Sequence, residues 1–280
     1  KFDEKNFQLM IKNFKDVIFI NNNKRLNNLL WKSDLSSVNQ LKNIMTTNDF
    51  IIAEQRVRLQ KLIKSKNKIE KLKIYNFKDP GVLFDYANYL QSTKKYKKVS
   101  NIIFNLSKNP VNLGLSYKWS DLRIYHARRE LRLGNIMKAY KISSNHLISN
   151  EFFVNNDFKE SKKGYVELEW LSGFIALNFL KKPEVAIKHF SNILDLVNNK
   201  NFQSKNFYWY ARSLEKLNRI NEAQDYYEKG SIYVSTFYGQ LSAERINKNL
   251  LDLSEIEDRN YDCKKVNLFE NSIINLGKKL

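Results

Sequence analysis

The sequence predicts an all-α fold, in which antiparallel helix pairs of unequal length stack as an α-solenoid. Apolar residues recur at intervals of three and four along most of the chain, which is the period of one helix face. The 280 residues include only 8 Gly and 3 Pro, too few for the frequent turns of a β-sandwich or barrel. Hydrophobic residues make up 42% and aromatic residues 13%, which excludes an intrinsically disordered or low-complexity chain.

The elements are expected in the following order. The first 75 residues read as helical, with an apolar stripe of Leu26, Leu29, Leu30 and Trp31. Asp79-Pro80-Gly81 is a helix-start signal, because Pro is favoured at the first helical position. The helical period then runs from Leu83 to Leu106 with one break over Ser92 to Lys95, which predicts a helical hairpin. A mostly polar stretch, Asn198 to Asn206, is expected to separate the third hairpin from the fourth.

One pattern of three residues repeats along the chain and defines the hairpins. It consists of a small residue, a second residue twelve positions later and a third residue four further on. The copies are Ala87/Val99/Ile103, Ala127/Ala139/Ser143, Ala211/Ala223/Tyr227 and a weaker one, Phe174/Ala186/Phe190. Small residues at these places allow two helices to approach closely. The hairpins are similar to those of tetratricopeptide (TPR) proteins, but their unequal intervals differ from a regular period of about 34 residues.

The chain is strongly basic, with 48 Lys and Arg against 29 Asp and Glu and a net charge of +19. Clustered basic residues would favour a nucleic-acid partner. However, no tract of five consecutive basic residues occurs, and Lys is abundant together with Asn, Ile, Phe and Tyr, the residues with codons rich in A and T. We therefore interpret the charge mainly as composition and solvated helix faces, and we expect no nucleic-acid partner. No window is apolar enough to predict an integral membrane span.

No recognisable catalytic, cofactor-binding or metal-binding motif is found, so we predict no residue for any of these roles and no cofactor. The three histidines, His126, His146 and His189, show no metal-ligand spacing. The single cysteine, Cys263, excludes an internal disulfide and a multi-cysteine metal site. Glu167 and Glu169 are two apart on an expected helix and should point to different faces.

Three segments carry a more specific signal. They are Glu169-Trp170-Leu171-Ser172-Gly173-Phe174 with its continuation to Leu180, Tyr208-Trp209 followed by Arg212 and Glu215, and Phe237-Tyr238-Gly239-Gln240-Leu241. The residue sequences of these segments, and their order along the chain, resemble those of the soluble lytic murein transglycosylase family. Phe174 stands here in place of a usual Trp. Asp79-Pro80-Gly81, Ala127-Arg128-Arg129 and Leu29-Leu30-Trp31 extend the resemblance toward the start of the chain. The resemblance covers residues 80–246 and, more loosely, the part before.

The resemblance implies a right-handed, U-shaped α-superhelix over residues 1–248 and the first helix of a linker domain over 249–280. In this family a separate lysozyme-like domain cleaves the glycan strand of peptidoglycan, with one Glu as acid and base, and leaves 1,6-anhydromuramyl ends. The only Glu-Ser dipeptide, Glu160-Ser161, lies in a Lys-rich segment that we read as a loop, and no Gly-Leu-Met-Gln follows it. The catalytic domain is therefore expected to be absent, and this chain alone to be inactive.

We accordingly expect a non-catalytic scaffold of a peptidoglycan lytic transglycosylase. Its expected partners are peptidoglycan glycan strands and its own missing catalytic domain, and its expected location is the periplasm of a Gram-negative bacterium. The chain begins at Lys1 without a signal peptide, so we expect a piece of a longer protein. The alternative is a TPR-like adaptor that binds a peptide or a partner protein. The aromatic residues Tyr208, Trp209 and Tyr238 are expected in the core.

Overall fold

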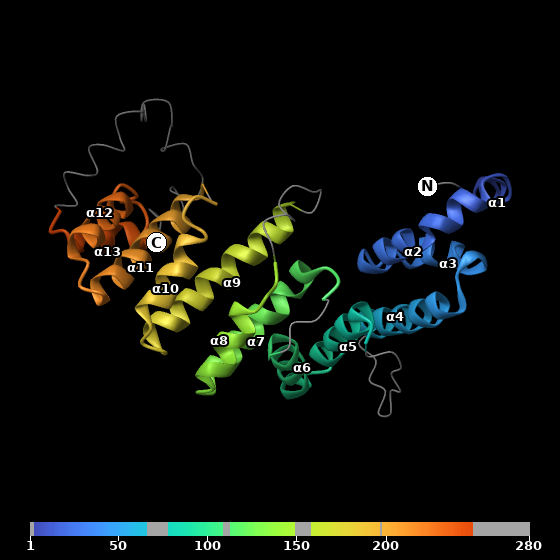
Figure 1. Cartoon of the computed structure of the whole chain (residues 1–280), viewed down its shortest axis with the longest axis horizontal. Helices are drawn as coiled ribbons and strands as arrows, with labels where there is room; N and C mark the ends of the chain where they lie inside the picture. The colour runs from blue at the N-terminus through green and yellow to red at the C-terminus, as the bar shows by residue number, and fades with distance from the viewer. Residues whose placement is uncertain (1–2, 66–77, 109–112, 149–157, 197, 249–280) are drawn as a thin grey trace, which may run out of the picture. The chain divides into compact units, whose positions relative to one another are not determined.

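The computed structural model describes residues 3–65, 78–108, 113–148, 158–196 and 198–248 (Figure 1). Over these residues the fold is all-α, with thirteen α-helices, two short 3-10 helices and no strand. This confirms the all-α part of the predicted fold class. The expected start of a linker domain at 249–280 and Cys263 lie outside the described residues. The chain forms two compact units, residues 1–180 and 181–280, and each is described by itself.

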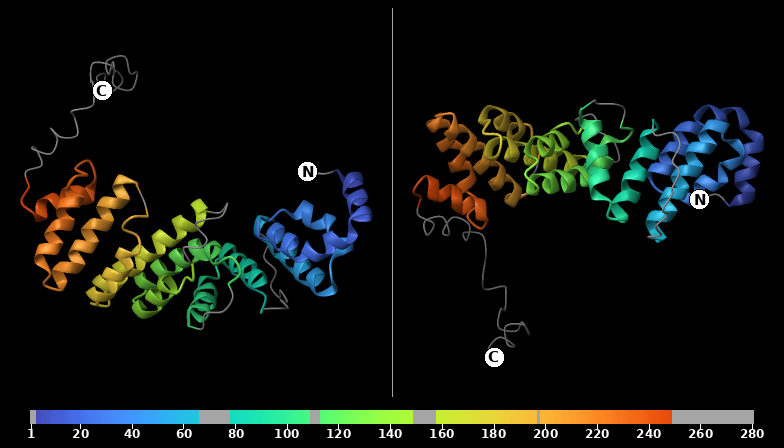
Figure 2. Two further views of the ribbon diagram at one scale, coloured as in Figure 1. Left: turned by 45° about the horizontal axis from the view of Figure 1, so that its top comes forward. Right: turned by 90° about the horizontal axis from the view of Figure 1, so that it is seen from below.

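The first unit contains helices that pack mainly on their neighbours in the chain (Figure 2). They are α1 (Glu4–Asn13), α2 (Lys15–Trp31), α3 (Leu35–Gln40), η1 (Lys42–Ile44), α4 (Thr47–Ser65), α5 (Pro80–Ser92), α6 (Tyr96–Lys108), η2 (Ser116–Trp119), α7 (Ser120–Arg132), α8 (Ile136–Ser144) and α9 (Phe158–Asn178). Helices α5 and α6 form the first expected hairpin, and α7 and α8 form the second. Helix α9 then packs on both α7 and α8.

The second unit is built around one central helix. Its elements are α10 (Pro183–Ser191), α11 (Lys200–Lys216), α12 (Ile220–Ser231) and α13 (Phe237–Arg245). Helix α11 packs against α10, α12 and α13. We expected the polar stretch Asn198 to Asn206 to separate two hairpins, but most of it is the first part of α11. Asn199 caps this helix by accepting from the Phe202 N–H at 3.2 Å, and Asn206 is buried, donating to the Phe190 carbonyl at 3.2 Å.

In three copies of the repeated pattern the small residues are buried, and the two helices of each of these hairpins, α5/α6, α7/α8 and α11/α12, pack on each other. Ala87, Ala127 and Ala211 are each 0% exposed. So are the second members Val99 and Ala139. A side chain that ends at Cβ leaves room for the backbone of the facing helix, so the hairpins depend on the size of these residues.

The turns within the hairpins share one backbone geometry. Lys94, Gly134 and Asn218 each have a positive φ, of 61°, 79° and 59°. The next N–H closes the turn on a carbonyl five residues back, as in Lys95 to Leu90 at 2.8 Å. Asn135 to Glu130 and Arg219 to Leu214 repeat this bond at 2.9 and 3.0 Å. This is the Schellman C-cap, which ends a helix and satisfies its last carbonyls.

Two buried arginines connect helices of the first unit. Arg56 Nε on α4 lies 2.7 Å from Asp85 Oδ2 on α5, and burial raises the pKa of Asp85 to about 6. Arg123 on α7 is completely buried, and its Nη1 donates to the Ile142 carbonyl at 2.8 Å and to Ser107 Oγ at 2.9 Å. Burial lowers the pKa of Arg123 to about 10. Its partners lie at the ends of α6 and α8, where carbonyl dipoles favour a cation.

Replacing Ala127 by Leu should destabilise the first unit, because three extra carbon atoms have no space between α7 and α8. We expect a loss of about 1–3 kcal/mol in the free energy of unfolding, measured by urea denaturation followed by circular dichroism. Lys97→Leu, at an exposed position of α6, is the control and should change stability by less than about 0.5 kcal/mol. Equal midpoints for the two variants would show that the contact is not tight.

Candidate functional site

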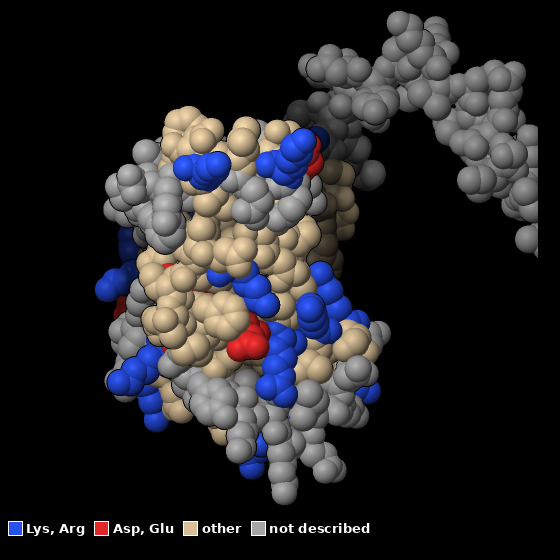
Figure 3. Space-filling model, turned by 90° about the vertical axis from the view of Figure 1, so that its right-hand side faces the viewer, with Lys and Arg blue, Asp and Glu red and all other residues tan. Residues whose placement is uncertain are grey.

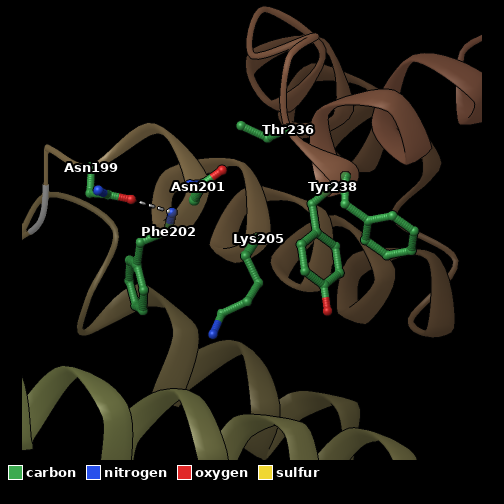
Figure 4. Close-up of a pocket in the computed structure, with 7 residues that line it drawn as sticks. Asn199, Asn201, Phe202, Lys205, Thr236 and Tyr238 are labelled. Carbon is green, nitrogen blue, oxygen red and sulfur yellow. Dashed lines mark hydrogen bonds between the residues drawn. The ribbon is translucent and has the colours of Figure 1, made fainter. Parts of the chain in front are cut away.

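An open groove in the second unit is the clearest candidate site in the part of the chain that the structure describes (Figure 4). Its volume is about 400 Å³. It lies between the first two turns of α11 and the first turn of α13. The side chains along it are Asn199, Asn201, Phe202, Lys205, Phe237 and Tyr238, with Thr236 at its edge. Aromatic rings, amides and one ammonium group therefore face the same space.

The α11 wall presents an aromatic ring and a cation on the same side of the helix. Phe202 and Lys205 are three residues apart, which places them on neighbouring positions of one helix face. The Lys205 ammonium lies 5.2 Å from the centre of the Phe202 ring, a cation–π distance. In Figure 4 the side chains of Phe202, Lys205 and Tyr238 project in the same direction.

The α13 wall begins at a capped helix start. Thr236 Oγ1 accepts from the Gly239 N–H at 3.0 Å, which holds the first turn of α13. Phe237 follows and is 68% exposed. Tyr238 packs edge-on against Phe237 at 5.2 Å between ring centres, and its ring centre lies 5.5 Å from that of Tyr208. One ring is thus open to solvent while the next is supported by the core.

Buried hydrogen bonds fix the two walls relative to each other. Tyr233 OH, in the turn before α13, donates to Gln203 Oε1 on α11 at 2.8 Å. Thr236 Oγ1 lies 2.8 Å from Ser204 Oγ. The turn also requires a glycine, because a Cβ on Gly239 would lie 1.9 Å from the Tyr233 carbonyl oxygen. The groove is therefore formed before any ligand binds.

The groove is positively charged by its own residues. The segments 199–210 and 231–241 contain Lys200 and Lys205 but no Asp or Glu. On the face drawn in Figure 3, Lys and Arg stand in several separate groups with uncharged surface between them. Charge at the groove therefore favours an anionic or neutral polar ligand.

A second cavity, of about 210 Å³, lies at the other end of α11. Its carboxylate, Glu215, is near two guanidinium groups, with Oε2 3.4 Å from Arg212 Nε and Oε1 3.9 Å from Arg245 Nη1. Burial, together with the Glu215 carboxylate, raises the pKa of Tyr227. The Arg212 and Glu215 of the quoted motif thus form an i,i+3 ion pair. The carboxylate of Glu215 is therefore engaged by the guanidinium groups of both arginines.

The three histidines lie in different surroundings. His126 is buried on α7, with Nε2 2.9 Å from Gln91 Oε1 and Nδ1 2.9 Å from Ser100 Oγ. Burial, and then the positive charge of Arg129, lowers the pKa of His126 to about 4. His146 accepts from the Ile148 N–H at Nδ1, so its Nε2–H donates to Glu169 Oε1 at 2.9 Å. His189 lies on α10 of the second unit. Among the described residues no three His, Cys, Asp or Glu gather as metal ligands.

We expected the Glu-Ser dipeptide in a loop, but it lies in a helix. Glu160 and Ser161 belong to the first turn of α9. Glu160 is exposed and forms an ion pair with Lys118 Nζ at 2.7 Å, whereas Ser161 is buried. Helical propensity explains the difference, because Lys and Glu are good helix formers and the segment contains no Pro. Glu167 and Glu169 do point to different partners, Arg128 at 3.5 Å and His146.

The Trp170 segment of α9 is a packing surface. Leu171 and Ile175 are buried in the main core of the first unit, and Trp170 packs against that core. The rings of Trp170 and Phe174 stack at 5.2 Å with an interplanar angle of 18°. Phe174 at the position of a usual Trp therefore still supplies a ring to stack on.

Sequence reasoning placed the aromatic residues correctly in part. Tyr208 is buried as expected, and Trp209 packs on the same cluster. Tyr238 also contacts this cluster but lines the groove. Sequence reasoning did not single out Phe202 and Lys205, and it named Phe237 only as part of a quoted segment. One signal was present, since Thr236 is a favourable N-cap residue and marks a helix start there.

Comparisons with protein-family models, with curated proteins and with solved structures find no match for this chain. In the described part of the chain, no helix combines the length and the apolar character needed to cross a membrane.

Acid should destabilise the first unit through His126. The unfolded residue takes up a proton near its ordinary pKa of 6.5, whereas the folded one resists protonation down to about 4. Stability is thus complete above pH 6.5 and falls as the pH drops toward 4. When the pH falls from 7 to 4.5, the free energy of unfolding of the unchanged protein should drop. In His126→Gln this drop should be smaller by about 2–3 kcal/mol. His189→Gln is the control and should lose as much as the unchanged protein; equal losses in all three would contradict the prediction.

Gly239→Ala should disrupt the groove, because the new methyl group would overlap the Tyr233 carbonyl. We expect a loss of more than about 1 kcal/mol in stability of the second unit despite the better helix propensity of Ala. Thermal unfolding monitored by tryptophan fluorescence would measure it through Trp209. Ser235→Ala, at an exposed position of the same turn, is the matched control. A variant as stable as this control would show that the turn relaxes freely.

Proposed function

We propose that this chain is the non-catalytic scaffold of a peptidoglycan lytic transglycosylase in the periplasm of a Gram-negative bacterium. The complete enzyme would cleave the bond between N-acetylmuramic acid and N-acetylglucosamine and leave 1,6-anhydromuramyl ends. This chain would frame the glycan strands for a lysozyme-like catalytic domain that it does not itself contain. The observation that carries the proposal is the resemblance of its motifs, which fall on packed helices in the expected order.

Each quoted motif has a structural role consistent with such a scaffold. The Trp170 segment supplies the edge of the core of the first unit. The Tyr208-Trp209 segment is the central helix of the second unit. The Phe237 to Leu241 segment forms the glycine-dependent start of α13. These are positions where a helical family would need particular side chains for packing.

The local geometry supports a right-handed, U-shaped superhelix as part of this proposal. Hairpins with buried small residues and nearly identical Schellman turns recur along the chain. Repeated units of similar shape that pack in chain order generate a solenoid, and a constant small rotation between them gives it curvature.

The described carboxylates support a role without catalysis. Glycan cleavage by this chemistry needs a carboxyl group that holds a proton near neutral pH and faces the substrate. Glu160 is exposed beside Lys118, and Glu215 lies between two arginines. Both carboxylates are therefore engaged in ion pairs with basic side chains. Asp85 has a raised pKa, but it is buried against Arg56, where a glycan strand cannot reach it.

A TPR-like adaptor is the second candidate function. The repeated three-residue pattern of the hairpins favours the adaptor, because TPR-like solenoids with small residues at the helix crossings commonly bind peptides or partner proteins. This reading requires no cell-wall polymer. The two candidates therefore make opposite predictions for binding to murein.

The full chain should sediment with purified, insoluble peptidoglycan and should release no anhydromuropeptides from it, as judged by chromatography of the soluble products. Binding should weaken with added salt, because the carboxylates of peptidoglycan stem peptides attract a chain of net charge +19. Heparin beads, which are also anionic, provide the control for charge alone, and murein should compete for the chain better than heparin does.

Two results would overturn this proposal. Release of anhydromuropeptides by the chain would contradict its non-catalytic role. Failure to sediment with murein, combined with capture of a defined peptide or protein partner, would support the adaptor.

A further inference from the structure

The groove between α11 and α13 combines three kinds of group that together recognise sugars. We propose that it binds an N-acetylated amino sugar bearing a carboxylate, as one residue of a glycan strand. This inference rests on the proposed function and assigns to it a binding site outside any catalytic domain. It is supported by the exposed rings, the amides, the charge and the size of the groove.

The aromatic rings provide surfaces for the apolar face of a sugar. Phe237 is 68% exposed and lines the groove, so its ring is accessible to a ligand there. Tyr238 is held against Tyr208 and Trp209, with its ring centre 5.5 and 6.3 Å from theirs. A rigid ring loses little conformational entropy when a ligand stacks on it. The C–H groups of a pyranose ring and an acetamido methyl group would match these surfaces.

The amides provide directional hydrogen bonds. Asn199 and Asn201 are exposed at the start of α11. An asparagine side chain both donates and accepts, as sugar hydroxyls and the acetamido group do. The side-chain oxygen of Asn199 accepts from the Phe202 N–H (Figure 4), so the helix cap fixes the orientation of this amide.

The charge favours a ligand that carries a carboxylate. The two segments that build the groove contain Lys200 and Lys205 and no acidic residue. Lys205 Nζ is placed over the Phe202 ring at 5.2 Å, so its ammonium group lies beside an apolar surface. A sugar with an acidic substituent would stack on the rings and pair with this ammonium group. A neutral sugar would use only the rings and amides.

The size of the groove favours a sugar over a folded protein partner. Its volume of about 400 Å³ lies in the range of small-ligand sites, roughly 300–1,000 Å³. A stable protein–protein contact covers about 800 Å² on each partner, which seven groove residues do not supply. The bonds Tyr233–Gln203 and Thr236–Ser204 keep the groove formed in advance, which reduces the entropy cost of binding.

Two soluble probes test the site with the full chain. One is the neutral tetramer of N-acetylglucosamine, and the other is the disaccharide of N-acetylglucosamine and N-acetylmuramic acid, which carries a carboxylate. Binding can be followed by tryptophan fluorescence, because Trp209 contacts Tyr238. Per sugar residue, we expect the carboxylated probe to bind more tightly than the neutral one.

Two variants divide the contributions. Phe237→Ala should weaken both probes by about tenfold, because both stack on the ring. Lys205→Met keeps an apolar side chain of similar length and should remove only the preference for the carboxylated probe. The matched controls are Lys229→Met, whose ammonium lies 4.3 Å from the Tyr226 ring outside the groove, and Ile232→Ala, an exposed apolar residue that does not line the groove. Neither control should change binding.

The outcomes separate this inference from the proposed function. Sedimentation with murein that the groove variants do not reduce would overturn the site and leave the scaffold function intact. Sugar binding through the groove without binding to murein would support the site and overturn the scaffold function. Binding of an acidic peptide but of neither sugar would overturn the site and favour the adaptor.

Discussion

The close approach of two helices at a small buried side chain is the contact on which the rest of the structure depends. Ala87, Ala127 and Ala211 are completely buried, each in a hairpin whose two helices pack on each other. A larger residue would force each pair apart, and the Schellman turns, which bring the second helix back within a few residues, would no longer direct it onto the first. Hairpin geometry is therefore set by backbone distance, and the large side chains fill the spaces between hairpins.

Between helices, buried polar groups determine which helices pair. Arg123 reaches the ends of α6 and α8 without a carboxylate partner among the described ion pairs, and the helix-end carbonyls compensate its charge. Arg56 and Asp85 join α4 to α5. Such groups add little net stability, because their desolvation offsets their attraction. They do penalise any other pairing, in which the same charges would be buried without partners.

In the second unit, one helix contributes residues both to the core and to the groove. The middle of α11 gives Tyr208 and Ala211 to the core, while its first two turns give Phe202 and Lys205 to the groove. The buried Ser204 and Asn206 lie between these roles and tie α11 to α13 and to α10. A groove carried by a packed helix and a capped helix start stays rigid, which is the condition for selective binding of a small polar ligand.

Periodicity, the repeated small residues and the scarcity of Gly and Pro were enough to determine an all-α fold, the hairpins α5/α6, α7/α8 and α11/α12 and their turns, because these features act over a few residues. They also predicted a hairpin from Phe174 and Ala186, but α9 and α10 belong to different units. The tertiary structure decided what depends on distant partners. The polar sequence of Asn198 to Asn206 predicted a segment between hairpins. Sequence alone does not show that Ser204 and Asn206 are buried with hydrogen-bond partners. Glu160-Ser161 became part of a helix, and Phe237 came to face Phe202 across a groove. Only folding brings residues more than thirty positions apart to one surface, so a local pattern predicts helices but not the site that they build.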